Sequence, residues 1–322
     1  MPSSAVRSFT DPDDYAATIR GGIVELTVTG RGDFSEKLTR VDLPRLWLQR
    51  FSENLARIVH ATNTPGRAMV QFRTALGPSL SLGGLEIGPT VILRHGEADT
   101  YHHRSSGSVS FAAMSLPIEE MAAVAEAMAG VDLTPPQDMM LITSSLDAIA
   151  KFRRLHAAAG DLAENAPEII ANPDAARGLE QALIEALVDC LDTRQRTENS
   201  LAQSQHAIVM RRFRRVVEEN PEQPLSIAEI CKAIGVSEST SRMCCQEHLG
   251  MSPKRYLLLR RMGLARRALR QAKPDATSVI AVGTRYGFWE LGRFAGVYLS
   301  LFGESPSATL RRPPEQQRAP IC

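Results

Sequence analysis

Hydrophobic and polar residues follow three different patterns along the chain. The first begins at Gly22, where GIVELTVTG alternates between two faces, as strands do. Short apolar runs separated by Gly, Pro, Asn and Ser follow it: LARIVHAT, AMVQFRT, TVILRHG and SVSFAAMSL. Several short strands at this spacing predict a sandwich or a barrel. The run RLWLQRFSENL fits either a strand or a helix.

The second pattern is helical and begins after Leu116. Two helices are predicted over IEEMAAVAEAMAG and SSLDAIAKFRRLHAAAGDLAENA. A third begins with Asn172 as N-cap and Pro173 in the first turn. Its apolar stripe is Leu179, Ala182, Leu183, Ala186, Leu187 and Leu191. Such a stripe packs against its own domain or pairs with its copy in a dimer, and both interpretations stay open.

The third pattern consists of short helices between sharp stops. Ser226 and Glu229 have the spacing of a capping box, and Gly235 ends the helix that they start. Ser237 caps the next helix, which Gly250 ends. Two short helices joined by a tight turn containing Gly are typical of a helix-turn-helix.

This unit occurs twice. The segment Leu249–Pro253 is repeated as Phe302–Pro306, displaced by 53 residues, and Ala228–Gly235 is repeated as Ala281–Gly287. A long basic helix starting at Ser252 and Pro253 joins the copies. We therefore predict a second short helix, about residues 290–301, held by a rigid support. Short helices of this kind fit the major groove of DNA, and two would enter successive grooves about 34 Å apart.

The charges divide in the same way. The net charge of the whole chain is +1, yet residues 1–205 carry 18 Lys and Arg against 26 Asp and Glu, and residues 206–322 carry 19 against 10. An acidic first part and a basic second part indicate two domains with different functions. A compact basic region is what a nucleic-acid-binding domain requires.

The patterns predict a domain organisation. We expect a polar arm over 1–20 and an N-terminal domain over 21–195, β-rich over 21–116 and helical over 117–195. A linker over 196–206 and a tail over 313–322 flank a DNA-binding domain over 207–312. The fold class is therefore α+β, with an all-α C-terminal domain.

Other chemistry finds little support. No apolar run of about 18 residues and no signal peptide is visible, so we expect a cytoplasmic protein. We find no phosphate-binding loop of the GxxxxGK type, no HExxH and no GxSxG, and we expect neither an enzyme nor a cofactor. His95, His102 and His103 suggest a metal, but adjacent residues point to opposite faces of a strand. Cys244 and Cys245 suggest a redox switch, but free Cys usually packs as a small hydrophobe.

The quoted C-terminal segments resemble the AraC/XylS family of transcription regulators. The resemblance covers about residues 208–312 and rests on IAEICKAIGVSE, EHLGMSPKRYL, RYGF, GRFAGVY and LFGESPSATLR. It implies a tandem helix-turn-helix domain that binds double-stranded DNA near promoters, usually as an activator that works with RNA polymerase and often as a homodimer. It also implies an N-terminal domain, cupin-like in many relatives, that senses a small-molecule effector or mediates self-association.

The resemblance places DNA-facing positions of the first recognition helix on Ser239, Arg242 and Met243. Arg242 is the strongest candidate for reading a base, because a guanidinium can bond guanine O6 and N7 together. A phosphate contact or a solvated surface role is the alternative for Arg242.

In the second recognition helix the same positions fall on Leu291, Gly292, Ala295 and Gly296. None of these can make a bidentate bond to a base, although Leu291 and Ala295 can touch thymine methyls. We therefore expect the first helix to read sequence and the second to set register and read shape. Trp289 and Arg293 flank these positions: Trp289 stands where relatives often carry a capping serine, and Arg293 suits a phosphate.

Three functions compete on these grounds. The favoured one is a ligand-responsive transcription regulator. The second is an enzyme whose N-terminal domain works beside a DNA anchor. The third is a constitutive DNA-binding regulator whose N-terminal domain only dimerises.

Overall fold

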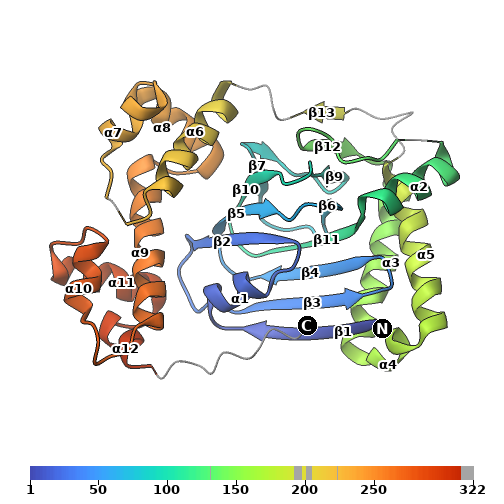
Figure 1. The fold of residues 1–322 in the computed structure, drawn as a ribbon, viewed down its shortest axis with the longest axis horizontal. Coiled ribbons are helices and arrows are strands. Elements are labelled where there is room, and N and C mark those ends of the chain that lie inside the picture. Colours follow the sequence, from blue (N-terminus) through green and yellow to red (C-terminus); the bar gives the residue numbers. More distant parts are fainter. Residues whose placement is uncertain (131, 192–197, 201–204, 223, 313–322) are drawn as a thin grey trace. The chain divides into compact units, whose positions relative to one another are not determined.

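The computed structural model describes residues 1–130, 132–191, 198–200, 205–222 and 224–312 (Figure 1). The chain divides into two compact units. One comprises Met1–Leu26 and Phe34–Ser204, and the other comprises Thr27–Asp33 and Gln205–Cys322. No helix in the described ranges is both long and apolar enough to cross a bilayer. The predicted tail over 313–322 lies outside the described residues.

The first unit is built on an antiparallel sheet of eight strands. Their spatial order is β1-β3-β4-β11-β6-β9-β12-β13. In chain order these strands are β1 Ser3–Phe9, β3 Glu36–Asp42, β4 Trp47–Glu53, β6 Arg67–Arg73, β9 Val91–Arg94, β11 Val109–Pro117, β12 Met140–Thr143 and β13 Glu198–Ser200. The ambiguous run RLWLQRFSENL is therefore a strand, β4, paired on both edges with β3 and β11.

A second antiparallel sheet has five strands in the order β2-β5-β10-β7-β8. These are β2 Gly22–Val28, β5 Arg57–Asn63, β7 Leu80–Leu82, β8 Leu85–Glu86 and β10 Thr100–Ser105. The two sheets meet face to face: the amide of Gln71 donates to the Tyr101 hydroxyl over 2.9 Å, and the rings of His103 and Phe111 are 5.4 Å apart. The predicted β-rich region is confirmed as two packed sheets.

Helices cover the other face of the large sheet. They are α2 Ile118–Ala129, α3 Leu146–Asn165, α4 Pro167–Ala171 and α5 Pro173–Leu191. Because residues alternate along a strand, Leu48, Val70 and Met114 face these helices and share one core with Leu183 and Leu187. The stripe of α5 is thus covered within its own domain, and it is not a free dimerisation surface. All three predicted helices of this region are confirmed, with Asn172 Oδ1 accepting the backbone N–H groups of residues 174 and 175.

Two expectations are corrected. The segment predicted as a polar arm contains β1 and a helix, α1 Pro12–Thr18, which Asp11 caps. β1 pairs along its full length with β3. A strand at a sheet edge needs backbone partners and no apolar alternation, so its pattern stays polar. For the same reason Glu198–Ser200, inside the predicted linker, pairs with β12, while most of that linker lies outside the described residues.

The second unit is helical. Its elements are α6 Gln205–Glu219, α7 Ile227–Ile234, α8 Glu238–Leu249, α9 Pro253–Gln271, α10 Val279–Arg285, α11 Leu291–Phe302 and α12 Pro306–Arg311. Figure 1 shows α9 running between two helix groups, α6–α8 beside one half and α10–α12 beside the other. The tandem arrangement predicted from the repeat is confirmed.

Candidate nucleic-acid interface

The two copies of the repeat are held by matching caps. Ser226 Oγ accepts the N–H of Glu229, whose carboxylate accepts the N–H of Ser226, so the predicted capping box is present. Ser237, Ser252, Ser278 and Ser305 likewise cap α8, α9, α10 and α12 through their hydroxyls. Gly250 and Gly303 end α8 and α11 with φ of 67° and 70°, a conformation that costs glycine little.

Each short helix is anchored by its buried face. The buried face of α8 consists of Cys244, Cys245 and Leu249, and that of α11 includes Phe294 and Tyr298. All five side chains are inaccessible to solvent or nearly so. The Tyr298 hydroxyl donates to Thr309 Oγ1 over 2.9 Å and ties α11 to α12. The opposite faces of α8 and α11 are therefore presented in fixed orientations.

The predicted reading positions of α8 lie together on its exposed face. Ser239, Arg242 and Met243 are all exposed, and Met243 keeps 53% of its surface. In the part of the chain that the structure describes, no ion pair or hydrogen bond holds the Arg242 guanidinium. Gln246, one turn after Arg242, shares this face. The sequence reasoning missed it, although the spacing of four residues was the available signal.

The exposed face of α11 carries fewer polar side chains than that of α8. Gly292, Arg293 and Gly296 are exposed, as predicted positions should be, while Leu291 and Ala295 are half-buried. Leu291 lies against α10, since a Cβ built on Gly283 would come within 3.2 Å of its Cδ2. Leu299 was missed and leaves 52% of its surface exposed. At the repeat offset it occupies the place of Gln246.

The start of α11 differs from the expectation. Its N-cap is Glu290, which makes no side-chain cap bond. The serine of the first copy, Ser237, is thus replaced by Glu290 and not by Trp289. The Trp289 ring precedes the helix and is 77% exposed. Arg293 lies 3.8 Å from the Glu290 carboxylate, and both groups are solvated.

The arginines of the basic helices α6 and α9 differ in burial. Arg214, Arg260 and Arg266 are buried. Arg260 donates to the carbonyl of residue 217 over 3.3 Å, and the Arg266 guanidinium lies 5.3 Å from the Phe302 ring. These side chains stabilise the domain. Arg211, Arg212, Lys254 and Arg255 are exposed and available to phosphates. Arg215 is also exposed but donates to Glu219 over 2.8 Å, and Arg261, Arg267 and Arg270 are half-buried.

The adjacent cysteines Cys244 and Cys245 are free and buried, and the histidines of the N-terminal unit pack against other side chains. Burial raises the pKa of Cys244, and it raises that of Cys245 to about 12. The thiolate that oxidation requires is therefore disfavoured. His102 contacts His60, whereas His103 points into the protein beside Phe111, as opposite strand faces require. No cluster of metal-ligating side chains occurs within the described ranges.

Comparison with known proteins matches this region. A helix-turn-helix domain family model covers residues 230–312. The probable thc operon regulatory protein of Rhodococcus erythropolis is 40% identical over 98 residues, 30% of each chain. The XylDLEGF operon transcriptional activator 3 of Pseudomonas putida is 36% identical over 103 residues, 31% of each chain. The C-terminal unit belongs to the AraC/XylS family.

The family model and these two curated relatives match about a third of this chain or less. Our chain spans about a third of the length of the curated relatives in these alignments. A solved structure of a probable AraC family transcriptional regulator from Rhodopseudomonas palustris is 30% identical, covering 33% of this chain and 98% of that one, with a TM-score of 0.30. The matched relatives are regulators and activators by name.

Proposed function

We propose that the protein is a sequence-specific DNA-binding transcription regulator of the AraC/XylS type, and that it acts as an activator responding to a small ligand. The observation that carries this proposal is the tandem unit itself, in which α8 and α11 each end at a left-handed glycine and each expose one face. The matched relatives from Pseudomonas putida are named as activators.

The connecting helix supports binding along one face of a duplex. A 19-residue helix such as α9 is about 28 Å long. Successive major grooves on one face of DNA are about 34 Å apart. A rigid rod of this length, with a recognition helix near each end, suits two neighbouring grooves.

The division of labour between the recognition helices is part of the proposal. The α8 face offers Ser239, Arg242 and Gln246, which can bond base edges. The α11 face offers Gly292 and Gly296. A Cβ atom added at either glycine would have no other atom within 4 Å, so the backbone there is open. We infer that α8 reads bases and that α11 lets its backbone approach the sugar–phosphate edge and sets register.

The ligand response, self-association into a homodimer, and contact with RNA polymerase in the cytoplasm complete the proposal. They are what the resemblance of the C-terminal unit to the AraC/XylS family implies. Since α5 buries its apolar stripe, a dimer must use a surface other than this stripe.

Fluorescence anisotropy with the full chain and labelled duplexes tests the DNA-binding function. About 6–10 phosphate contacts predict a loss of roughly 10³–10⁵ in affinity between low and moderate salt. Arg242→Ala should flatten the preference at one base pair, at a cost of about 1–3 kcal/mol. Lys232→Ala, at an exposed site on α7, serves as control. A salt slope near zero contradicts the proposal, and equal weakening on all sequences reassigns Arg242 to a phosphate.

A further inference from the structure

Two histidines from different strands face each other on the five-stranded sheet. His60 lies on β5 and His102 lies on β10, and the antiparallel register places the two residues directly opposite each other. β5 and β10 are neighbours in this sheet (Figure 1). The centres of the two imidazole rings are 5.6 Å apart. We call His60 and His102 the histidine pair. The sequence pattern set His102 beside His103 and gave no signal for His60.

The histidine pair points away from the core between the two sheets. Residues alternate between the two faces of a strand. Tyr101 and His103, which flank His102, are buried with 7% and 5% of their surfaces exposed, and Val59 beside His60 is also buried. His60 and His102 themselves are half-buried. The pair therefore lies on the outer face of the sheet, which solvent reaches.

The strands that carry the pair are held in place. β5 and β10 lie inside the order β2-β5-β10-β7-β8, so each has a partner strand on both edges. Tyr101, next to His102, contacts the large sheet, where its hydroxyl accepts the amide of Gln71 over 2.9 Å. Both imidazoles thus project from a fixed backbone. A ligand that binds them loses little free energy in ordering the site.

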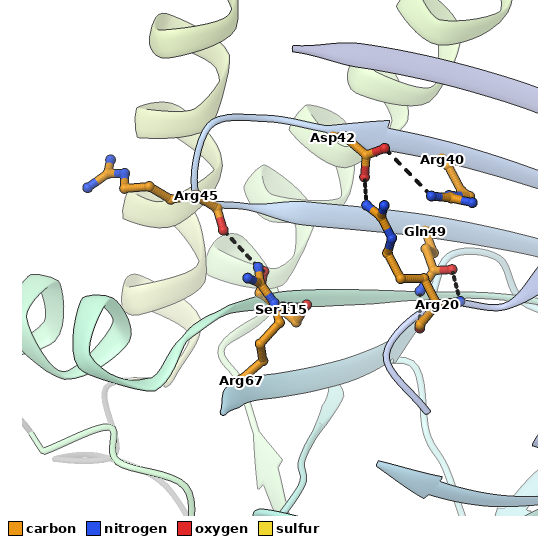
Figure 2. A network of polar contacts seen from close by, with 7 residues as sticks. All are labelled: Arg20, Arg40, Asp42, Arg45, Gln49, Arg67 and Ser115. Atoms are coloured by element: carbon orange, nitrogen blue, oxygen red, sulfur yellow. Dashed lines mark hydrogen bonds and ion pairs between the residues drawn. The ribbon is translucent and has the colours of Figure 1, made fainter. Parts of the chain in front are cut away.

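The strand beside β5 is tied to the large sheet as well. Arg20 comes just before β2, and its backbone N–H and carbonyl bond to the side chain of Gln49 on β4, both over 2.8 Å. The Arg20 guanidinium donates to Asp42 on β3 over 2.6 Å (Figure 2). These contacts hold the edge of the five-stranded sheet against the large sheet, and they add to the rigidity of the support.

The spacing of the two rings suits one shared metal ion. Zinc binds imidazole nitrogen at about 2.0–2.1 Å and prefers tetrahedral geometry. With each nitrogen about 1.1 Å from the centre of its ring, two imidazoles on one such ion have ring centres about 5 Å apart. The observed separation is 5.6 Å. A small rotation about the side-chain bonds closes this difference.

The neighbours of the pair on this face are two threonines and an arginine. The hydroxyls of Thr62 and Thr100 are 3.2 Å apart, one step along the face from the pair. Arg104 lies one step along in the other direction, and its Nε donates to Ser81 Oγ over 3.4 Å. Because Ser81 belongs to β7, the Arg104 charge is directed to the side of β10 opposite β5.

We propose that the histidine pair binds a divalent transition-metal ion, with Zn²⁺ as the reference ion. Imidazole ligands suit zinc, nickel and copper, whereas magnesium and calcium prefer oxygen ligands. Across the described ranges, no group of three or more His, Cys, Asp or Glu side chains could hold a metal. Water therefore fills the remaining positions on the ion, and the ion exchanges with solvent. This site goes beyond the proposed function, which requires no metal.

Equilibrium dialysis of the full chain against Zn²⁺ tests the proposal. No DNA is present, so the outcome does not depend on DNA binding. The protein is prepared without a histidine tag and with Cys322→Ser, which removes a thiol that would compete for zinc, because the other four cysteines are buried. We expect saturable binding of one Zn²⁺ per chain with a Kd of about 1 mM or below. Mg²⁺ should not bind.

Variants locate the site. His60→Gln and His102→Gln should each weaken zinc binding by roughly 10-fold or more, because even the loss of a group that only orients a metal ligand costs about 10–100-fold. His206→Gln removes a half-buried histidine of α6 and should leave zinc binding unchanged. Melting temperatures without metal show that each variant folds. Zinc should raise the melting temperature of the parent and of His206→Gln, and this rise should be lost in both pair variants.

Four results overturn the proposal. They are the absence of saturable zinc binding, equal binding of Mg²⁺, unchanged zinc binding in either folded pair variant, and a loss in His206→Gln as large as in the pair variants. The last two would place the zinc ion at another site. If one pair variant fails to fold, the other decides the outcome, because the two histidines lie on different strands.

Discussion

Replacing Glu36 by Gln should remove a pH-dependent loss of stability. The Glu36 side chain is 3% exposed, and its Oε1 accepts the backbone N–H of Asn54 over 3.0 Å. The neighbouring Glu53 carboxylate already accepts the Tyr15 hydroxyl at 2.8 Å and Arg57 Nε at 2.5 Å. Burial first, and then the charge of Glu53, raise the pKa of Glu36 from 4.5 to about 8.

The sign and size of the effect follow from linkage. Between pH 4.5 and about 8 the folded protein keeps a proton on Glu36 that the unfolded chain releases. The contribution is therefore fully present below pH 4.5 and is lost as pH rises through about 8. At about 1.36 kcal/mol per pH unit, the loss in unfolding free energy is roughly 3–5 kcal/mol.

Urea unfolding at several values between pH 5 and pH 8 measures this contribution. Buried histidines act in the opposite direction, because burial lowers the pKa values of His95, His103 and His156. The difference between parent and variant isolates Glu36, since both proteins keep these histidines. Glu36→Gln should gain stability relative to the parent as pH rises, whereas Glu126→Gln, at an exposed site on α2, should follow the parent. A constant difference between parent and Glu36→Gln across this range would refute the reasoning.

Three further predictions concern packing, capping and the recognition helix. Leu187→Ala, on the buried face of α5, should lower the unfolding free energy by about 2–5 kcal/mol. Gel filtration should show an unchanged oligomeric state. Ser226→Ala should cost about 1 kcal/mol in denaturant unfolding of the C-terminal unit, because it removes one half of the capping box. Gly296→Ala should raise that stability by about 0.5–1 kcal/mol yet weaken DNA binding in anisotropy titrations, because the added methyl blocks close approach. Gly178→Ala, at an equally open site on α5, should leave DNA binding unchanged. If Gly296→Ala bound DNA as tightly as the parent, α11 would not approach the DNA closely.

The C-terminal unit could be predicted from sequence because its signals are local. Ser226 and Glu229 are three residues apart, and Gly250 directly follows the helix that it ends. Each cap is decided by atoms within one helical turn. The repeat at an offset of 53 residues gave the same helix signals a second time. The start of α11 was placed one residue early because Glu290, an unusual N-cap without a side-chain bond, gave no signal.

The N-terminal unit was harder because its decisive contacts join distant residues. β1 was missed because its structure depends on pairing with β3, whose partner residues lie 27 to 39 positions further along the chain. Whether the apolar stripe of α5 is buried in its own domain also depends on which strands and helices pack against it, and the sequence pattern alone does not determine this. The contacts of Arg20 and Arg67 with the Trp47 ring were invisible for the same reason, since these residues come from the segment before β2, from β6 and from β4.

Selection of bound duplexes from random DNA tests the central claim most directly. If α8 and α11 enter successive major grooves, the selected sites should contain two contact regions about 10–10.5 base pairs apart. The region beneath α8 should show sharp base preferences, and the region beneath α11 should show weak ones. No enrichment at low salt, or stronger base preferences beneath α11 than beneath α8, would contradict this account.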